Sequence, residues 1–332
     1  MSSIVQVKRS RAVGLSLQSV VVAILATGSL YFLFQTWLSL AWPSAHDSSY
    51  LHTILFLIDR YNLVPYRDIF EPSLPLTYMF HLAIGKTLGW SDPAFRAVDV
   101  AYLSALLLVT WRIMRPLGAL VAWAAALSFG LLYQSFGPTM SLQRDFLCLL
   151  PAAVAIWVAG DVTVFGRRRW RYLAIGALFG LAATIKPHFP VGLLPVLVYA
   201  AFADGRLRAG RRAVGRRDLL TVAALVGTGL GLAVALSLLW LWRMDALAPF
   251  WDIAGHYLPL YRQLNGNQEL LSSGEKWVYV LTNASALGGK AGLLMAAALG
   301  LYWGLVEMKL GAPQRRLVVL LALMLPVYFI YE

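Results

Sequence analysis

Acidic residues are scarce in this chain. Only 16 of its 332 residues are Asp or Glu, against 28 Lys and Arg, and charged residues of both signs make up 13% of the total. The hydrophobic fraction is 59% and the mean hydropathy is +0.67. Together with apolar runs of about 20 residues, these values exceed what a soluble core of this length needs and are typical of a protein with several membrane spans.

Other absences narrow the fold class and the chemistry. The alternating pattern of barrel strands is missing, so the spans must be helices, whose backbone groups are satisfied without water. The fold class is therefore predicted to be all-α. A single cysteine, Cys148, excludes an internal disulfide and is interpreted as a packing residue. No GxGxxG motif precedes a helix and no Walker-type loop occurs, so no nucleotide site is predicted.

The net charge of +12 comes from short basic clusters rather than from one basic surface. VKRSR, GRRRWR, GRLRAGRRAVGRR and QRR all lie between apolar runs. This distribution indicates membrane topology instead of nucleic-acid binding.

Apolar runs and helix breakers predict a single transmembrane domain over residues 1–332 with about nine spans. The predicted spans are 15–41, 97–113, 117–137, 143–161, 171–188, 190–204, 219–243, 290–308 and 317–332. The first run is too long for the core of a cleaved signal peptide and is expected to remain. The chain stops inside an apolar run, LPVYFIYE, so the expectation is a truncated C-terminus.

The segment 75–89 is apolar but short, and it decides the topology. If this segment lies on the membrane surface, one side of the membrane holds 18 of the 28 Lys and Arg and 4 of the 16 acids. If it crosses, the later basic loops lie opposite the basic N-terminus, against the positive-inside tendency. The N-terminus is therefore predicted to be cytoplasmic, with large external loops at 42–96 and 244–289.

The first external loop contains four acidic residues within 25 positions: Asp47, Asp59, Asp68 and Glu71. A helix is predicted over 47–61, because Leu51, Ile54, Leu55 and Ile58 recur at helical spacing. Asp47 is suited to cap the start of that helix. Prolines then interrupt the chain before a second surface helix, which begins near Pro75.

Charged side chains also stand at the predicted outer ends of spans. They are Arg96 and Asp99, then Arg144 and Asp145 with Gln143, then Lys186 and His188. Such residues are costly in a bilayer and indicate function by default. Under the predicted topology they share one level of one face with Asp47 and Glu71.

These motifs, in this order, resemble the polytopic lipid-linked-sugar glycosyltransferases of the GT-C type, which include protein O-mannosyltransferases and lipid A aminoarabinose transferases. The resemblance rests on Asp47 with Tyr50 three positions later, on VPYRDIFEPSLPLTY, on Arg96, and on SLQRDFLCLL and GLAATIKPHF. It covers roughly residues 15 to 290. Many relatives have two acidic residues at the start of this loop, whereas here His46 precedes Asp47 and Ser48 follows it. Relatives often have a lysine ahead of the prolines, where this chain has Ser73.

The resemblance implies a core of transmembrane helices, with interfacial helices in both external loops and a polyprenyl-phosphate sugar as donor. Asp47 would then be the catalytic base, supported by Asp145 and Glu71, and Arg96 and Lys186 would hold the phosphate. The predicted substrate-binding set also includes Tyr50, Arg67, His188, His256 and Tyr261. No nucleotide site is required for this chemistry. Whether a divalent cation binds stays open, since carboxylates are natural ligands for one but the spacing of the acidic residues predicts no metal site.

Simpler roles exist for the same residues. Asp47 would serve as a helix N-cap alone, Arg96 would pair with Asp99 one turn on, and Arg67 would pair with neighbouring loop acids. Lys186 would extend to lipid headgroups. With these structural roles alone, none of the residues would take part in a reaction.

The predicted function is that of an inverting glycosyltransferase in a bacterial inner membrane. It would move a sugar from polyprenyl phosphate to a lipid, glycan or protein acceptor on the outer, periplasmic face. The alternatives are a transporter or lipid flippase, and a non-catalytic assembly subunit. A transporter usually shows internal repeats and ionisable groups near the midplane, and neither feature is found here.

Overall fold

The computed structural model of the chain describes residues 2–165, 169–203, 216–261 and 310–331, with a few positions between 272 and 306. Within these residues every regular element is a helix, which confirms the predicted all-α class. An isolated bridge between Pro65 and Ile69 is the one strand-like pairing in the described part of the chain.

The helices follow one another with short connections. The first half comprises α1 (Ser2–Ser39), α2 (Asp47–Tyr61), α3 (Pro75–Leu88), α4 (Asp92–Met114), η1 (Arg115–Leu117), α5 (Ala119–Ser135) and η2 (Gly137–Met140). The second comprises α6 (Arg144–Gly160), α7 (Val162–Phe165), α8 (Trp170–Ala183), η3 (Phe189–Gly192), α9 (Leu193–Ala203), α10 (Arg216–Arg243), α11 (Leu247–Asp252), the π-helical turn η4 (Ile253–Tyr257), α12 (Leu258–Tyr261) and α15 (Ala312–Tyr331).

Three helical segments in the described residues are long and apolar enough to cross a membrane: Gln18–Ser39, Asp92–Leu117 and Arg217–Arg243. Other apolar helices are shorter; α8 has 14 residues, a rise of about 21 Å against a hydrocarbon core of about 30 Å. The structure therefore supports a helical membrane protein with three candidate spans, fewer than the nine predicted. Most of the predicted span at 290–308 lies outside the described residues.

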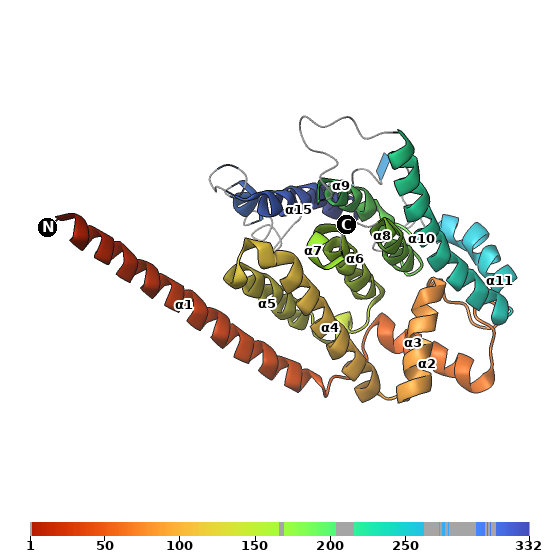
Figure 1. Ribbon diagram of the computed structural model, residues 1–332. Helices are drawn as coiled ribbons and strands as arrows, with labels where there is room; N and C mark the ends of the chain where they lie inside the picture. Colours follow the sequence, from red (N-terminus) through yellow and green to blue (C-terminus); the bar gives the residue numbers. More distant parts are fainter. Residues whose placement is uncertain are drawn as a thin grey trace.

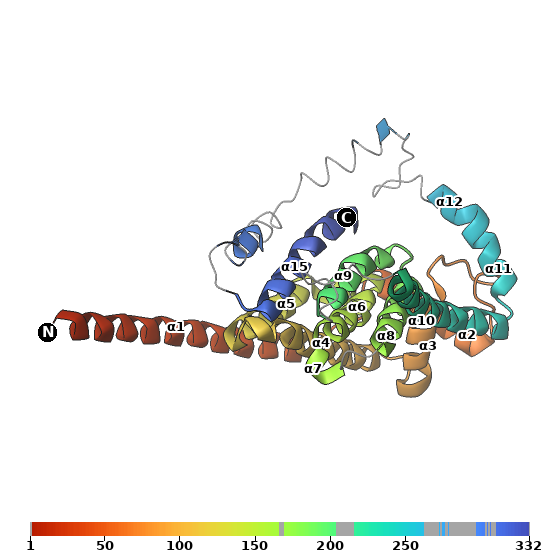
Figure 2. The same ribbon diagram turned by 45° about the horizontal axis from the view of Figure 1, so that its top comes forward.

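Helices α4, α5, α6, α8, α9 and α10 gather in one body, from which α1 projects toward the N-terminus (Figures 1 and 2). The α1 helix packs on α5, where Trp123 Nε1 donates to Ser29 Oγ at 2.9 Å. Helices α2 and α3 lie together beside the end of α10 (Figure 1). Asp47 at the start of α2 meets Arg144 at the start of α6.

The helix predicted over 47–61 is confirmed in both its bounds and its buried face. Its buried side chains include all four predicted apolar residues, Leu51, Ile54, Leu55 and Ile58. They pack against Tyr78 and Leu82 of α3 and Leu241 of α10. The cysteine interpretation is also consistent with the structure, since Cys148 is fully buried among apolar side chains.

Close packing of α8 on α10 depends on two glycines. A Cβ atom at Gly229 would overlap the carbonyl oxygen of Leu173, and one at Gly176 would overlap that of Val226. Helix backbone cannot yield as a flexible side chain does, so an added methyl would push the helices apart. This contact bears out the interpretation of the ALVGTGLGLA glycines as packing residues for Gly229 alone, because a Cβ at Gly227 or Gly231 would meet nothing within 4 Å.

We expect Gly229→Ala to lower the melting temperature of the purified protein, because overpacking typically costs about 1–3 kcal/mol. Gly227→Ala is the matched control on the same helix, since a Cβ there meets nothing within 4 Å. Alanine also favours helix over glycine, so the control should be neutral or stabilising. Equal shifts for both variants would contradict the packing argument.

Two neighbouring histidines, His81 buried and His52 half-buried, link α2, α3 and α4. The His52 ring stacks on Phe95 with centroids 3.7 Å apart, and the centroids of His52 and His81 are 5.3 Å apart. Neither Nε2 atom has a hydrogen-bond partner. Burial lowers the pKa of His81 to about 4, and burial with the neighbouring His81 lowers the pKa of His52 to about 3.

Stability should therefore fall as the pH decreases from about 6.5 toward 4, because the unfolded chain binds protons there that the folded chain excludes. Each histidine would contribute up to about 1.4 kcal/mol per pH unit. The measurement is the free energy of unfolding in detergent at several pH values. His81→Leu should flatten the dependence, whereas His256→Gln, a change at an exposed histidine, should leave it as in the parent.

Candidate functional site

Charged residues from α2, from the loop before α3, from α6 and from the turn after α8 form one cluster. Arg144 donates to Asp47 Oδ2 at 3.3 Å and to Ser73 Oγ at 3.1 Å. The next residue, Asp145, forms an ion pair with Lys186. Arg144 and Asp145 are successive residues at the start of α6, so the first turn of that helix carries both ion pairs. The four charged residues Asp47, Arg144, Asp145 and Lys186 are called the cluster below.

Asp47 is the first residue of α2 and does not cap it. The N-cap position belongs to His46, and no side chain makes a capping hydrogen bond. The N-cap interpretation of Asp47 is therefore wrong. Its carboxylate is 50% exposed and lies 3.1 Å from His46 Nδ1 and 3.3 Å from Arg144. The helix N-terminus favours its negative charge.

Glu71 is buried, and its carboxylate binds Ser73. Its two carboxylate oxygens accept from the Ser73 amide and hydroxyl, both at 2.9 Å, and 7% of the residue is exposed. The Ser73 hydroxyl in turn accepts from Arg144. The carboxylate oxygens of Glu71, predicted as a catalytic residue, are thus both bonded to the serine that contacts Arg144.

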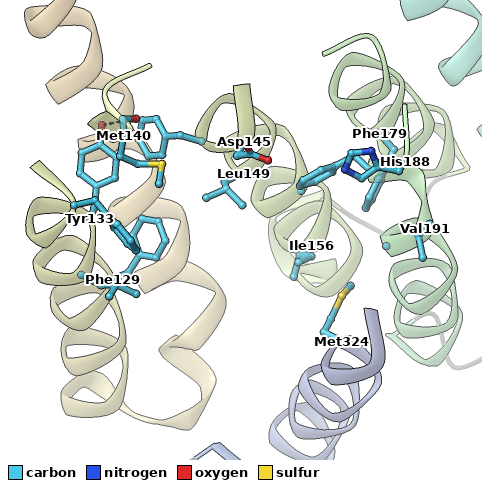
Figure 3. Close-up of a pocket in the computed structure, with 16 residues that line it drawn as sticks. Phe129, Tyr133, Met140, Asp145, Leu149, Ile156, Phe179, His188, Val191 and Met324 are labelled. Atoms are coloured by element: carbon cyan, nitrogen blue, oxygen red, sulfur yellow. Dashed lines mark hydrogen bonds between the residues drawn. The ribbon is translucent and has the colours of Figure 1, made fainter. Parts of the chain in front are cut away.

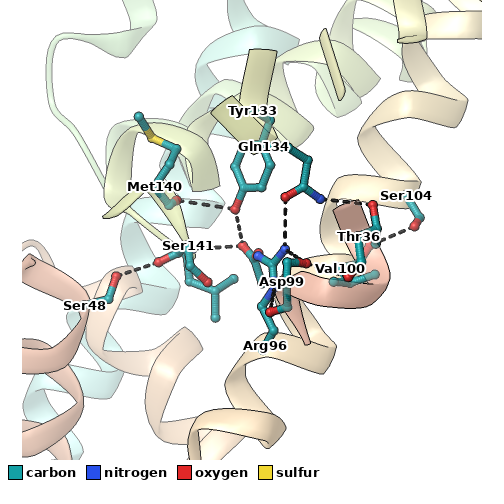
Figure 4. A network of polar contacts seen from close by, with 12 residues as sticks. Thr36, Ser48, Arg96, Asp99, Val100, Ser104, Tyr133, Gln134, Met140 and Ser141 are labelled. Carbon is teal, nitrogen blue, oxygen red and sulfur yellow. Dashed lines mark hydrogen bonds and ion pairs between the residues drawn. The ribbon is translucent and has the colours of Figure 1, made fainter. Parts of the chain in front are cut away.

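Arg96 occupies a buried network and is not open to a phosphate. It is 2% exposed, pairs with Asp99, and donates to Ser39 and Gln134 (Figure 4). Trp42 lies under its guanidinium, 4.5 Å from ring centroid to Cζ. The structure therefore corrects the prediction that Arg96 binds phosphate and shows the alternative, an ion pair with Asp99.

That buried network fixes the loop that precedes α6. Asp99 Oδ1 accepts from the Leu142 amide at 3.0 Å and from the Tyr133 hydroxyl at 2.6 Å. Ser48 of α2 donates to the Ser141 carbonyl at 2.5 Å (Figure 4). Asp99, paired with Arg96, thus holds the loop from which Arg144 and Asp145 follow. Ser48 connects the start of α2 to the same loop.

Two backbone conformations beside the cluster are uncommon for non-glycine residues. His46 has φ 55° immediately before Asp47, and Leu142 has φ 50° two residues before Arg144. Such conformations cost about 1–3 kcal/mol and persist where surrounding contacts enforce them, often at functional sites. They orient the first residues of α2 and α6 toward each other.

The remaining predicted residues divide into two groups. Tyr50 is exposed on α2, one turn after Asp47, and His188 lines a cavity together with Asp145. The contacts of Arg67, in contrast, go to Asp68 and Asp245, and those of His256 to Asp252 on its own helix turn. The structure does not bring Arg67 or His256 to the cluster. Tyr261 ends α12, and its side chain lies outside the described residues.

An apolar cavity of about 440 Å³ begins at the cluster (Figure 3). Asp145, Leu149, Ala152 and Ile156 line it from one face of α6, a stretch of 12 residues that rises about 16 Å. Three of the residues that line the cavity have ionisable side chains: Tyr133, Asp145 and His188. Three lining side chains, Leu132, Phe136 and Val191, are also exposed at the surface, so the cavity opens through apolar residues.

Arg144 was absent from the predicted site residues although it bridges the cluster. Its sequence signal is the QRD tripeptide at the start of a predicted span, where an arginine and an aspartate would both be costly. Among the described residues, no three His, Cys, Asp or Glu side chains come together as metal ligands would.

Comparison of the chain with protein-family models, with curated proteins and with solved structures found no match.

Proposed function

We propose that the protein is a membrane glycosyltransferase that moves a sugar from a polyprenyl-phosphate donor to a hydroxyl or amine acceptor. The observation that carries the proposal is the junction of a long apolar cavity with a cluster of two carboxylates and two cations. A lipid-linked sugar has the same division: an apolar chain, then a phosphate, then a polar sugar. In this assignment the chain lies along α6, and the phosphate lies between Lys186 and Arg144.

In the proposed reaction an acceptor oxygen or nitrogen attacks C1 of the sugar from the side opposite the phosphate. Asp47 takes the proton from the acceptor, the new bond to C1 forms, and the bond from C1 to the phosphate oxygen breaks. Polyprenyl phosphate leaves with the electron pair. The configuration at C1 inverts, and neither a nucleotide nor a redox partner is consumed.

Arg144 replaces Arg96 in the proposed phosphate site. A leaving phosphate gains negative charge in the transition state, so cations already held in place stabilise it selectively. Lys186 is held by Asp145, and Arg144 is held by Asp47 and Ser73. Ser73 occupies the position at which relatives often have a lysine. Its hydroxyl contacts Arg144, so in this proposal Arg144 supplies the positive charge that the lysine would carry.

The finer points of location and assembly belong to this proposal. They are a bacterial inner membrane, a cytoplasmic N-terminus, a GT-C-like arrangement of about nine spans with interfacial helices, and a site that faces the periplasm. The acceptor would be a lipid, glycan or protein. The basic clusters and the common level of the charged helix ends support this orientation.

The test is transfer from a radiolabelled polyprenyl-phosphate sugar, added without nucleotide sugar, to acceptors in a membrane extract. The purified protein should label an acceptor. Ala152→Trp narrows the cavity one turn beyond Leu149, so it should impair long-chain donors more than a donor with a short prenyl chain. Absence of labelled product with every polyprenyl sugar tested, or equal losses for both chain lengths, would count against the proposal.

A further inference from the structure

A second cavity, of about 530 Å³, lies where α2 and α3 meet the end of α10. One wall is apolar and includes Ile58, Met79, Leu82 and Trp240. The rim is charged and consists of Asp59, Lys86, Arg243 and Asp245. An apolar wall beneath a charged rim suits a molecule with a polar head and a hydrocarbon chain.

This cavity is separate from the cluster at Asp47. Asp59 follows Asp47 by 12 residues on the same helix, which corresponds to about 18 Å along its axis. A group bound there cannot reach the proposed base, since reacting atoms must approach to about 3–3.5 Å. The second cavity therefore needs an explanation of its own.

The position of α10 places the cavity at the level of lipid headgroups. The candidate membrane span Arg217–Arg243 ends at the cavity rim, and Trp240 lies one turn before that end. Tryptophan and arginine at the end of a span are typical of the membrane–water interface. Leu239 and Trp242 are exposed on α10 beside the cavity, as expected for residues that contact lipid.

Among the charged residues that line the second cavity, Arg243 can bind an anionic ligand. Lys86 pairs with Asp59 at 3.2 Å, and Arg67 lies 3.5 Å from Asp245. Within the part of the chain that the structure describes, Arg243 has neither an ion pair nor a side-chain hydrogen bond. Its guanidinium can donate two parallel hydrogen bonds to a phosphate, a geometry that lysine does not offer.

We propose that the second cavity binds one phospholipid of the surrounding bilayer. The phosphate diester lies on Arg243, and an acyl chain lies against Met79, Leu82 and Trp240. A bilayer lipid fits better than free phosphate because an apolar wall adjoins the cation at membrane level. The bound lipid would hold α2 and α3 against α10. This inference does not depend on the proposed sugar transfer.

The test is native mass spectrometry of the full chain, delipidated in detergent and then mixed with vesicles of phosphatidylglycerol and phosphatidylethanolamine. The parent protein should retain one phospholipid. Arg243→Gln should reduce its occupancy by about tenfold, because a charge-assisted hydrogen-bonded contact is lost. Arg60→Gln is the matched control: Arg60 is exposed on α2 next to Asp59 but does not line the cavity.

A second variant tests the same site if Arg243→Gln folds poorly. Ala83→Trp fills the cavity without changing its charge and should also release the lipid. Equal lipid retention by the parent, Arg243→Gln and Ala83→Trp would overturn the inference. Displacement of the lipid by millimolar inorganic phosphate would overturn it too, because the site would then recognise the phosphate alone.

Discussion

Replacing Asp47 by Asn is expected to reduce sugar transfer by a factor of about 10² to 10⁴, the usual contribution of a general base. Asparagine keeps the size of the side chain and its hydrogen-bonding oxygen but cannot accept the acceptor's proton. Stability should change little, because the lost ion pair with Arg144 is half exposed and such pairs contribute about 0–1 kcal/mol. Turnover is measured with the labelled polyprenyl-phosphate sugar at saturating donor.

Asp59→Asn provides the matched control for that experiment. Asp59 lies on the same helix and pairs with Lys86 at 3.2 Å, much as Asp47 pairs with Arg144 at 3.3 Å. It is about 18 Å from Asp47 along α2, so its loss should leave transfer near the parent rate. A well-folded Asp47→Asn protein with parental turnover would show that another group is the base.

Replacing Lys186 by Met is expected to be the second large effect, with transfer reduced by about 10² to 10³. Methionine approximates the length of lysine and removes the charge that would stabilise the leaving phosphate. Because that charge grows as the bond to C1 breaks, the loss should appear mainly in kcat rather than in KM. Donors with long and short prenyl chains should be affected equally, in contrast to the effect expected of Ala152→Trp.

The control for this variant is Lys86→Met. Lys86 also pairs with an aspartate, Asp59, but lies in the second cavity. A loss at Lys186 that Lys86→Met reproduces would indicate a general effect of surface charge on membrane binding. Partial recovery by Lys186→Arg would support a role in holding phosphate, since arginine keeps the positive charge.

Local patterns in the sequence were sufficient for the two helices between residues 42 and 96. The bounds and the buried face of α2 follow from apolar spacing over 15 residues, and α3 begins at Pro75 as predicted. The number of spans was harder to predict. Apolar runs reveal helices, but α5, α6 and α8 have 17, 17 and 14 residues, so their length does not by itself establish a crossing.

The roles of the arginines could not be assigned from their positions at helix ends. Arg144 is the first residue of α6 and Arg96 lies near the start of α4, each close to an aspartate, and both would carry the same cost in a bilayer. Only the fold shows that Arg96 is 2% exposed and surrounded by Ser39, Asp99 and Gln134, whereas Arg144 contacts Asp47 and Ser73. Burial depends on segments that are distant in the chain and leaves no local signal.

By itself, the sequence determined an all-helical, membrane-type chain and the segment between residues 47 and 71 where carboxylates gather, because composition and spacing act through local backbone physics. The tertiary structure decided which charges pair, which are buried, and that an apolar cavity starts at Asp145. Those outcomes depend on contacts between α2, α6 and the turn after α8. Such contacts are set by packing across more than 90 positions, as in the Asp47–Arg144 pair, rather than by neighbouring residues.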